Sequence, residues 1–151
     1  MVGVGGALRR GSLFGLVVVL AAVGALAGAE RAEARGCSIT ALKPVRSADG
    51  DRAIARVRVN CFGNSGGTLV VGLYQYRGLG YWREKRQIWF HVPRDASRVF
   101  RAGWTCASGT GLQTYETRFW AGITFKLNNG ENTLVEYSDY DGPNARFRCP
   151  V

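Results

Sequence analysis

Alternating apolar and polar positions predict that the chain from residue 35 onward is built of β-strands. In residues 53–61, "AIARVRVNC", alanine, valine and cysteine occupy the odd positions, while Arg56 and Arg58 lie among the even ones. A period of two is expected of a strand with one face in the core. Residues 68–76, "TLVVGLYQY", alternate less, which predicts a central strand covered on both faces.

The longest alternating segment, residues 113–127, puts Tyr115 and Ile123 on one face and Trp120 on the other. The "NNGEN" that follows contains Asn-Gly, which supplies the positive φ angles of tight turns and predicts a hairpin. Shorter strands are expected at residues 37–45, 87–92, 97–102, 133–138 and 145–149. Seven or eight short strands with turns between them predict an all-β fold, an antiparallel β-sandwich.

Residues 112–121, "LQTYETRFWA", resemble the strand that carries the tyrosine corner of immunoglobulin-like and fibronectin type III domains. Leu112, Tyr115 and Ala121 occupy the matching places. The resemblance implies an immunoglobulin-like sandwich. It does not extend to the immunoglobulin disulfide, because no cysteine lies two residues after Tyr115.

The N-terminal segment is typical of a secretory signal peptide. Arg9 and Arg10 precede an uncharged, apolar run over residues 11–29. Three A-x-A sites follow, and they end at Ala27, Ala29 and Ala34. The site at Ala34 lies past the apolar run, which favours residues 1–34 as the signal peptide and residues 35–151 as one exported domain without a further membrane span. The alternative is an uncleaved anchor helix, because the run is long enough to span a bilayer.

Four cysteines, an even number, predict two disulfides in an exported chain. We expect Cys37 to pair with Cys61 and Cys106 with Cys149, because neighbouring strands are usually neighbours in sequence. No C-x-x-C spacing indicates a zinc site, and neither a metal nor a cofactor is expected. With these cysteines, the leader and the tyrosine strand, the chain resembles small exported two-disulfide β proteins of high-GC bacteria, which mostly lack an assigned activity.

The chain is basic, with a formal net charge of +9 and 20 Lys and Arg residues. Three of these are lysines, namely Lys43, Lys85 and Lys126. An arginine-rich, lysine-poor sequence is what a GC-rich genome encodes, so the charge alone does not predict nucleic-acid binding. It still favours contact with anionic polymers or surfaces at low salt.

The segment "CFGNSGGTLVV" resembles the nucleophile loop of chymotrypsin-like serine proteases, with Asn64 where that family has Asp. A serine protease needs a histidine to accept the serine proton and an acid to orient it. The one histidine, His91, lies downstream of Ser65, and the chain is too short for two barrels. With Asp95 or Glu84 as the acid, a convergent triad is the remaining alternative. We interpret the segment as a hairpin loop after Cys61.

Two further groups of residues are candidates for a catalytic site and for a calcium site. His91 with Glu116 and Arg118 is the one set that a small basic ribonuclease-like hydrolase would use. The acidic pairs lie beside glycines and are too short to fill a calcium site, so they are expected in turns; they are Asp49 with Asp51 and Asp139 with Asp141.

The most suggestive binding surface is the hairpin over residues 74–90, which interleaves aromatic and basic side chains. Such a surface stacks on sugars, bases or aromatic side chains and pairs with phosphate or carboxylate. The residues expected to bind are Arg77, Tyr81, Trp82, Arg83 and Arg86.

The sequence therefore predicts a non-enzymatic binding module that is secreted or held at the cell envelope. Its expected partner is a protein, a glycan or an anionic envelope polymer, and nucleic acid is not expected. The alternatives are the small basic hydrolase and a cationic toxin or antimicrobial protein.

Overall fold

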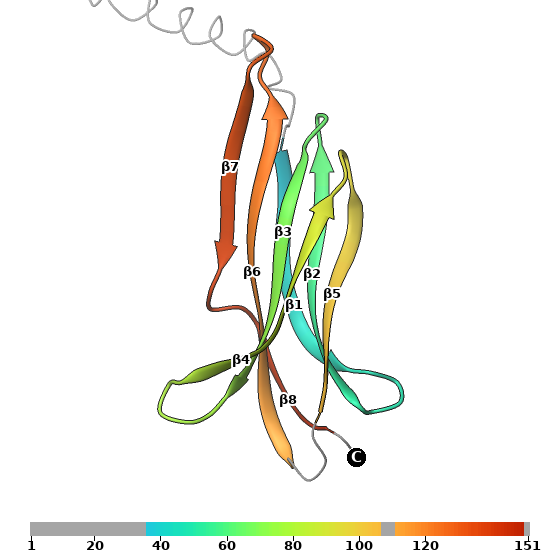
Figure 1. Cartoon of the computed structure of the whole chain (residues 1–151), viewed down its shortest axis with the longest axis vertical. Coiled ribbons are helices and arrows are strands. Elements are labelled where there is room, and N and C mark those ends of the chain that lie inside the picture. The colour runs from blue at the N-terminus through green and yellow to red at the C-terminus, as the bar shows by residue number, and fades with distance from the viewer. Residues whose placement is uncertain (1–35, 107–110, 150–151) are drawn as a thin grey trace, which may run out of the picture. The chain divides into compact units, whose positions relative to one another are not determined.

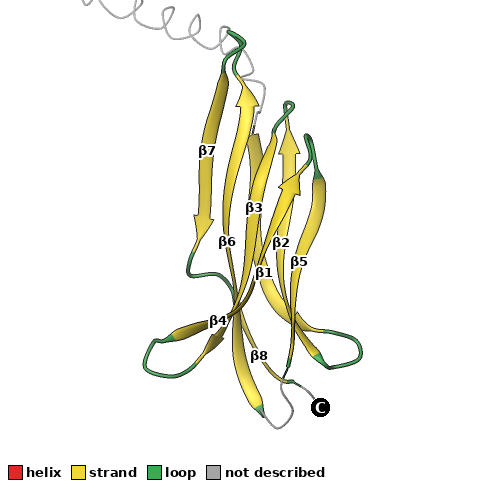
Figure 2. Cartoon of the chain, in the orientation of Figure 1, coloured by secondary structure: helices red, strands yellow, loops and turns green. Residues whose placement is uncertain are grey.

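A computed structural model describes residues 36–106 and 111–149, which form strands joined by turns (Figure 2). The strands are β1 (Gly36–Arg46), β2 (Arg52–Phe62), β3 (Gly66–Tyr76), β4 (Trp82–Val92), β5 (Ser97–Thr105), β6 (Leu112–Lys126), β7 (Asn132–Asp139) and β8 (Asn144–Arg148). The predicted signal peptide, residues 1–34, and its cleavage sites lie outside the described residues. No helix within the described ranges is long and apolar enough to cross a membrane.

The strands form two antiparallel sheets that face each other as a sandwich. One sheet has the order β1-β2-β5, and the other has the order β4-β3-β6-β7 with β8 also paired to β6. The predicted all-β, immunoglobulin-like sandwich is confirmed. In immunoglobulin constant domains the fourth strand joins the sheet of the first, second and fifth. Here β4 pairs with β3 in the other sheet, so the three-stranded sheet has β5 as an exposed edge.

Strands β7 and β8 share one edge of β6 and follow one another along it (Figure 1). Strand β7 pairs with residues 119–126 of β6 and β8 with residues 112–116. Between them, the amide of Thr117 donates to the carbonyl of Pro143 at 3.4 Å. The short segment between β7 and β8 places Tyr140 beside β6.

The core lies between the sheets and is made by the alternating residues that the sequence predicted. Ala53, Ala55, Val57 and Val59 of β2 are fully buried. The other sheet contributes fully buried side chains from β3 and β6, which are Leu69, Val71, Leu73, Tyr115, Thr117, Ala121 and Ile123. The hydroxyl of Tyr115 makes no hydrogen bond to any described residue, so the bond that defines a tyrosine corner is not formed there.

Both predicted disulfides are present. One lies within a sheet, and the other connects the two sheets. Cys37–Cys61 joins directly paired residues of β1 and β2 within one sheet. Cys106–Cys149 joins the residue after β5 to the residue after β8, so it connects the two sheets. The second pairing was expected between neighbouring strands, but the bond instead links strands of different sheets. Two such bonds are typical of proteins that fold in an oxidising environment outside the cytoplasm.

One turn corrects the sequence prediction and another confirms it. Residues 63–65 are not a hairpin loop, because they carry the chain from β2 in one sheet to β3 in the other; Gly63 and Asn64 have φ of 66° and 61° there. The hairpin predicted at residues 128–132 is confirmed, with the amide of Leu127 donating to the carbonyl of Glu131 at 2.8 Å.

Candidate functional site

The outer face of the five-stranded sheet gathers six aromatic side chains from strands far apart in sequence. We call this set the aromatic face; it consists of Tyr74, Tyr76, Trp82, Trp89, Trp120 and Tyr140. The strand register brings them together, because Trp89 and Trp120 both pair with Val70 and Trp82 pairs with Tyr76. Trp89 and Tyr140 are 66% and 62% exposed, so the face is available for contact.

A β-bulge is the reason that Trp82 and Trp89 share this face. Residues seven apart on a regular strand point to opposite sides of the sheet. The register of β3 and β4 shifts between Leu73 and Tyr74, so β4 contributes one extra residue and its alternation reverses. Trp82 is half-buried, with its ring centroid 5.2 Å from that of Tyr76.

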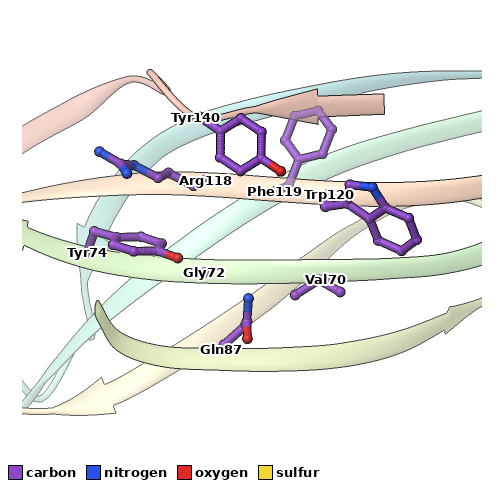
Figure 3. Close-up of a pocket in the computed structure, with 8 residues that line it drawn as sticks. All are labelled: Val70, Gly72, Tyr74, Gln87, Arg118, Phe119, Trp120 and Tyr140. Carbon is purple, nitrogen blue, oxygen red and sulfur yellow. The ribbon is translucent and has the colours of Figure 1, made fainter. Parts of the chain in front are cut away.

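A hollow in the middle of the aromatic face is centred on Gly72, which lies in register between Gln87 of β4 and Arg118 of β6. Figure 3 shows Tyr74, Arg118 and Trp120 around it. A Cβ on Gly72 would lie 2.7 Å from the ring of Tyr74, so a larger residue would displace that ring. The missing side chain therefore leaves the hollow open and lets the tyrosine lie flat beside it.

The charges inside this hollow neutralise one another. The guanidinium of Arg118 donates two hydrogen bonds to the carboxylate of Glu116, at 2.9 and 3.2 Å. Glu116 is only 3% exposed, so the carboxylate depends on this partner. The same guanidinium lies 4.6 Å from the ring centroid of Tyr74 and 5.8 Å from that of Trp82. Arg118 is therefore a positioning group that ties the buried acid to the aromatic rings.

The hydroxyl of Tyr74 adds a neutral polar group at the rim. It donates to the carboxylate of Glu84 at 3.3 Å. Burial raises the pKa of Tyr74 above its usual value of 10.0, and the charge of Glu84 raises it further. Tyr74 therefore stays protonated and able to donate at any pH near neutrality.

The five residues predicted to bind do not lie on one face. Trp82 belongs to the aromatic face, whereas Arg83 and Arg86 pair with Gln75 and Leu73, whose side chains point into the core. Both arginines are exposed and lie on the side of β4 that faces the edge of the other sheet. Tyr81 and Arg77 close the turn between β3 and β4, where the amide of Arg77 donates to the carbonyl of Tyr81 at 2.9 Å.

Ser65 is fully buried and has a structural role in the structure. Its hydroxyl donates to the carbonyl of Phe62 at 2.6 Å and accepts from the amide of Gly36 at 2.9 Å. Asp95, an acid considered for a triad, accepts from the amide of Asn64 at 2.8 Å. Through these bonds, Ser65 and Asp95 stabilise the segment that carries the chain from β2 in one sheet to β3 in the other.

The residues considered for a hydrolase are not assembled. Glu116 and Arg118 pair with each other, but His91 lies in register with Thr68, whereas Glu116 lies in register with Tyr74. Six residues of strand separate these rows, or about 20 Å. His91 borders a separate shallow pocket with Asn64 and Lys126.

The acidic pairs lie in turns, as predicted. The amide of Asp51 donates to Asp49 at 3.5 Å, and the amide of Asp141 donates to Asp139 at 3.2 Å. Hydrogen bonding from Ser47 is the main cause that lowers the pKa of Asp49. Across the described ranges, no three His, Cys, Asp or Glu side chains come close enough to hold a metal ion.

Sequence reasoning missed three residues of the site, namely Gln87, Trp120 and Tyr140. Trp120 had a usable signal, because the alternation of residues 113–127 put it on the polar face beside Arg118. Tyr140 had none, since its place depends on how the segment between β7 and β8 crosses β6.

Comparisons with known proteins assign no family. No protein-family model and no curated protein matches the chain. Three solved structures are similar at 12% identity. A β-glucosidase 3B from Thermotoga neapolitana with α-D-glucose has a TM-score of 0.34, and the alignment covers 74% of this chain and 17% of the glucosidase. A putative late embryogenesis abundant protein has a TM-score of 0.34 and coverages of 86% and 80%. An Arabidopsis thaliana protein has a TM-score of 0.36 and coverages of 80% and 85%. These scores are too low to support an inference about fold or function.

Proposed function

We propose that this chain is a non-enzymatic binding module that is secreted or held at the cell envelope, and that its aromatic face binds an uncharged glycan. One observation carries the proposal: six aromatic side chains lie on one exposed sheet face, around a hollow whose charged groups are already paired. Aromatic side chains offer large apolar area at a low entropic cost and retain polar groups at their edges.

The chemistry of the hollow fits sugar hydroxyls. A sugar ring has an apolar C–H face that stacks on an aromatic ring, and its hydroxyls both donate and accept hydrogen bonds. The side chain of Gln87 provides both functions, and the hydroxyl oxygen of Tyr74 and the carboxylate of Glu84 provide acceptors at the rim. An anionic ligand would have to compete with Glu116 for Arg118, which disfavours phosphate or carboxylate here.

The positions of the candidate catalytic groups support a role without catalysis. General acid–base chemistry needs groups within hydrogen-bond reach of the same substrate atom or of one bridging water. His91 lies about 20 Å from Glu116 along the strands. Ser65 has no exposed surface. Export through the predicted signal peptide agrees with the two disulfides.

The test is affinity electrophoresis of the disulfide-bonded chain in gels that contain β-1,4-glucan, β-1,3-glucan, xylan or mannan. We expect at least one neutral polysaccharide to retard the protein, and Trp89→Ala to weaken that binding about tenfold or more. Phe62→Ala is the matched control, because Phe62 is an exposed aromatic residue of β2, in the other sheet. The proposal is wrong if no neutral polysaccharide retards the protein, or if both variants bind as the unmodified chain does.

A further inference from the structure

The positive charge of the molecule is unevenly divided between its two sheets. The three strands β1, β2 and β5 contain seven Lys and Arg residues and no Asp or Glu. The strands of the other sheet also contain seven Lys and Arg residues, but they contain four acidic residues as well. Solubility alone does not require acidic and basic residues to be separated between the sheets, because a surface with both signs mixed keeps a protein equally soluble.

Four arginines occupy outward positions on the three-stranded sheet, and we call them the arginine face: Arg52, Arg56, Arg58 and Arg101. Their strand neighbours Ala53, Ala55, Val57 and Ala102 point into the core. Residues two apart on one strand are about 7 Å apart, so Arg56 and Arg58 form a short regular row with Arg52 about 13 Å further along.

The arrangement of these arginines is unfavourable for the protein alone. Arg56 and Arg101 are direct partners across β2 and β5, and like charges opposite each other destabilise a sheet. Arg56 turns its guanidinium to the carbonyl of Lys43, with hydrogen bonds of 3.0 and 3.3 Å. Arg52 lies 3.7 Å from the carboxylate of Asp51, whereas Arg58 and Arg101 have no acidic partner within the described part of the chain. Their donors are therefore free for a ligand.

The surroundings of the arginine face favour a soluble polyanion over a membrane. No large exposed apolar side chain lies among the four arginines, whereas a membrane-inserting surface needs such residues. The outward neighbours of the arginines are Leu42, Ile54 and Val99, which are partly buried, so little apolar surface is exposed between the charges. Thr40, the partner of Arg58 on β1, is polar. Guanidinium groups bind phosphate and carboxylate oxygens in a bidentate way, and rows of them match a ligand with repeating charges.

We propose that the arginine face binds a linear polymer that carries an oxyanion in each repeat, such as a phosphodiester or uronate polymer. The site is independent of the aromatic face, because the two lie on outer surfaces of different sheets. The chain would then hold a neutral glycan on one side and an anionic polymer on the other. An exported module of this kind links two components of an envelope or matrix.

The experiment measures binding of the full, disulfide-bonded chain to poly(glycerol phosphate), polygalacturonate and neutral dextran at increasing salt. We expect both anionic polymers or one of them to bind, dextran not to bind, and affinity to fall with salt. The variant Arg58→Glu/Arg101→Glu is expected to lose about tenfold or more in affinity. Its control is Arg146→Glu/Arg148→Glu, which makes the same charge change at exposed positions of β8 and is expected to lose far less.

Any result that differs from these expected results contradicts the proposal. Equal losses in the two variants would mean that net charge alone drives binding. Binding to vesicles of anionic phospholipid without binding to either soluble polymer would assign the face to a membrane. The phosphodiester and uronate arms identify the preferred oxyanion. Trp89→Ala should bind the polyanion normally, so failure of the glycan proposal leaves this one untouched.

Discussion

The two outer faces of the sandwich handle charge in opposite ways. On the aromatic face, Arg118 is bound to the buried Glu116 and lies against the ring of Tyr74. On the arginine face, Arg101 lies opposite Arg56 without an acid to compensate either. One fold therefore carries a face whose central arginine is paired with a buried acid and a face on which Arg58 and Arg101 have no acidic partner among the described residues. The difference indicates that the net charge of the chain describes neither face.

The largest expected effect concerns the disulfide that connects the two sheets. Cys106–Cys149 joins the sheets across 43 residues of sequence, whereas Cys37–Cys61 lies within the arginine-bearing sheet. Replacing Cys106 and Cys149 by serine should lower the free energy of unfolding by about 4 kcal/mol in the chain-entropy model. Urea denaturation followed by tryptophan fluorescence measures it. A loss under about 1 kcal/mol would show that the bridge adds little to the packing between the sheets.

The second prediction concerns the paired arginine of the aromatic face. Arg118→Met leaves the carboxylate of Glu116 buried without a partner and should cost about 3 kcal/mol. Adding Glu116→Gln to that variant should recover most of the loss, because the uncompensated charge is gone. Urea denaturation of the single and double variants provides the measurement. An equal loss in both would mean that Arg118 acts through packing and not through its charge.

The third prediction uses pH to probe the aromatic face. Because burial raises the pKa of Tyr74 in the folded chain above 10.0, the unfolded chain loses this proton first as pH rises. The stabilising contribution is complete below pH 10.0 and is lost as pH rises through the folded pKa. Tyr74→Phe should make the unfolding free energy fall less steeply above that pH. An unchanged slope would assign the alkaline loss elsewhere, for example to Tyr115, whose pKa is also raised by burial.

The smallest expected effect is on the arginine face. Arg101→Thr removes the like-charge partner of Arg56 and places a β-branched residue on a strand. The free energy of unfolding should rise by a few tenths of a kcal/mol, up to about 0.5 kcal/mol. Thermal unfolding at low salt detects the change, and high salt should reduce it. A clear loss of stability would contradict the view that this pair is kept for a ligand.

Local alternation was enough to predict the strands, their buried faces and the sandwich, because the side-chain period of a strand is read directly from sequence. It was not enough for the site. The bulge opposite Leu73 reverses the alternation of β4, so Trp82 and Arg83 could not be assigned to faces by counting. The sequence prediction also began this strand at residue 87, whereas β4 begins at Trp82. The run "WREKR" is largely exposed and therefore shows no alternation of apolar and polar residues. For this reason the pattern did not predict a strand there.

The measurement that tests the account most directly is the salt dependence of glycan binding. The disulfide-bonded chain is titrated with the neutral polysaccharide that retards it most, at about 50 mM and about 500 mM NaCl. If the ligand lies on the aromatic face, whose charges are paired within the protein, the affinity should change less than about twofold. An affinity that falls tenfold or more at high salt would place the ligand on unpaired arginines and contradict the division of the two faces.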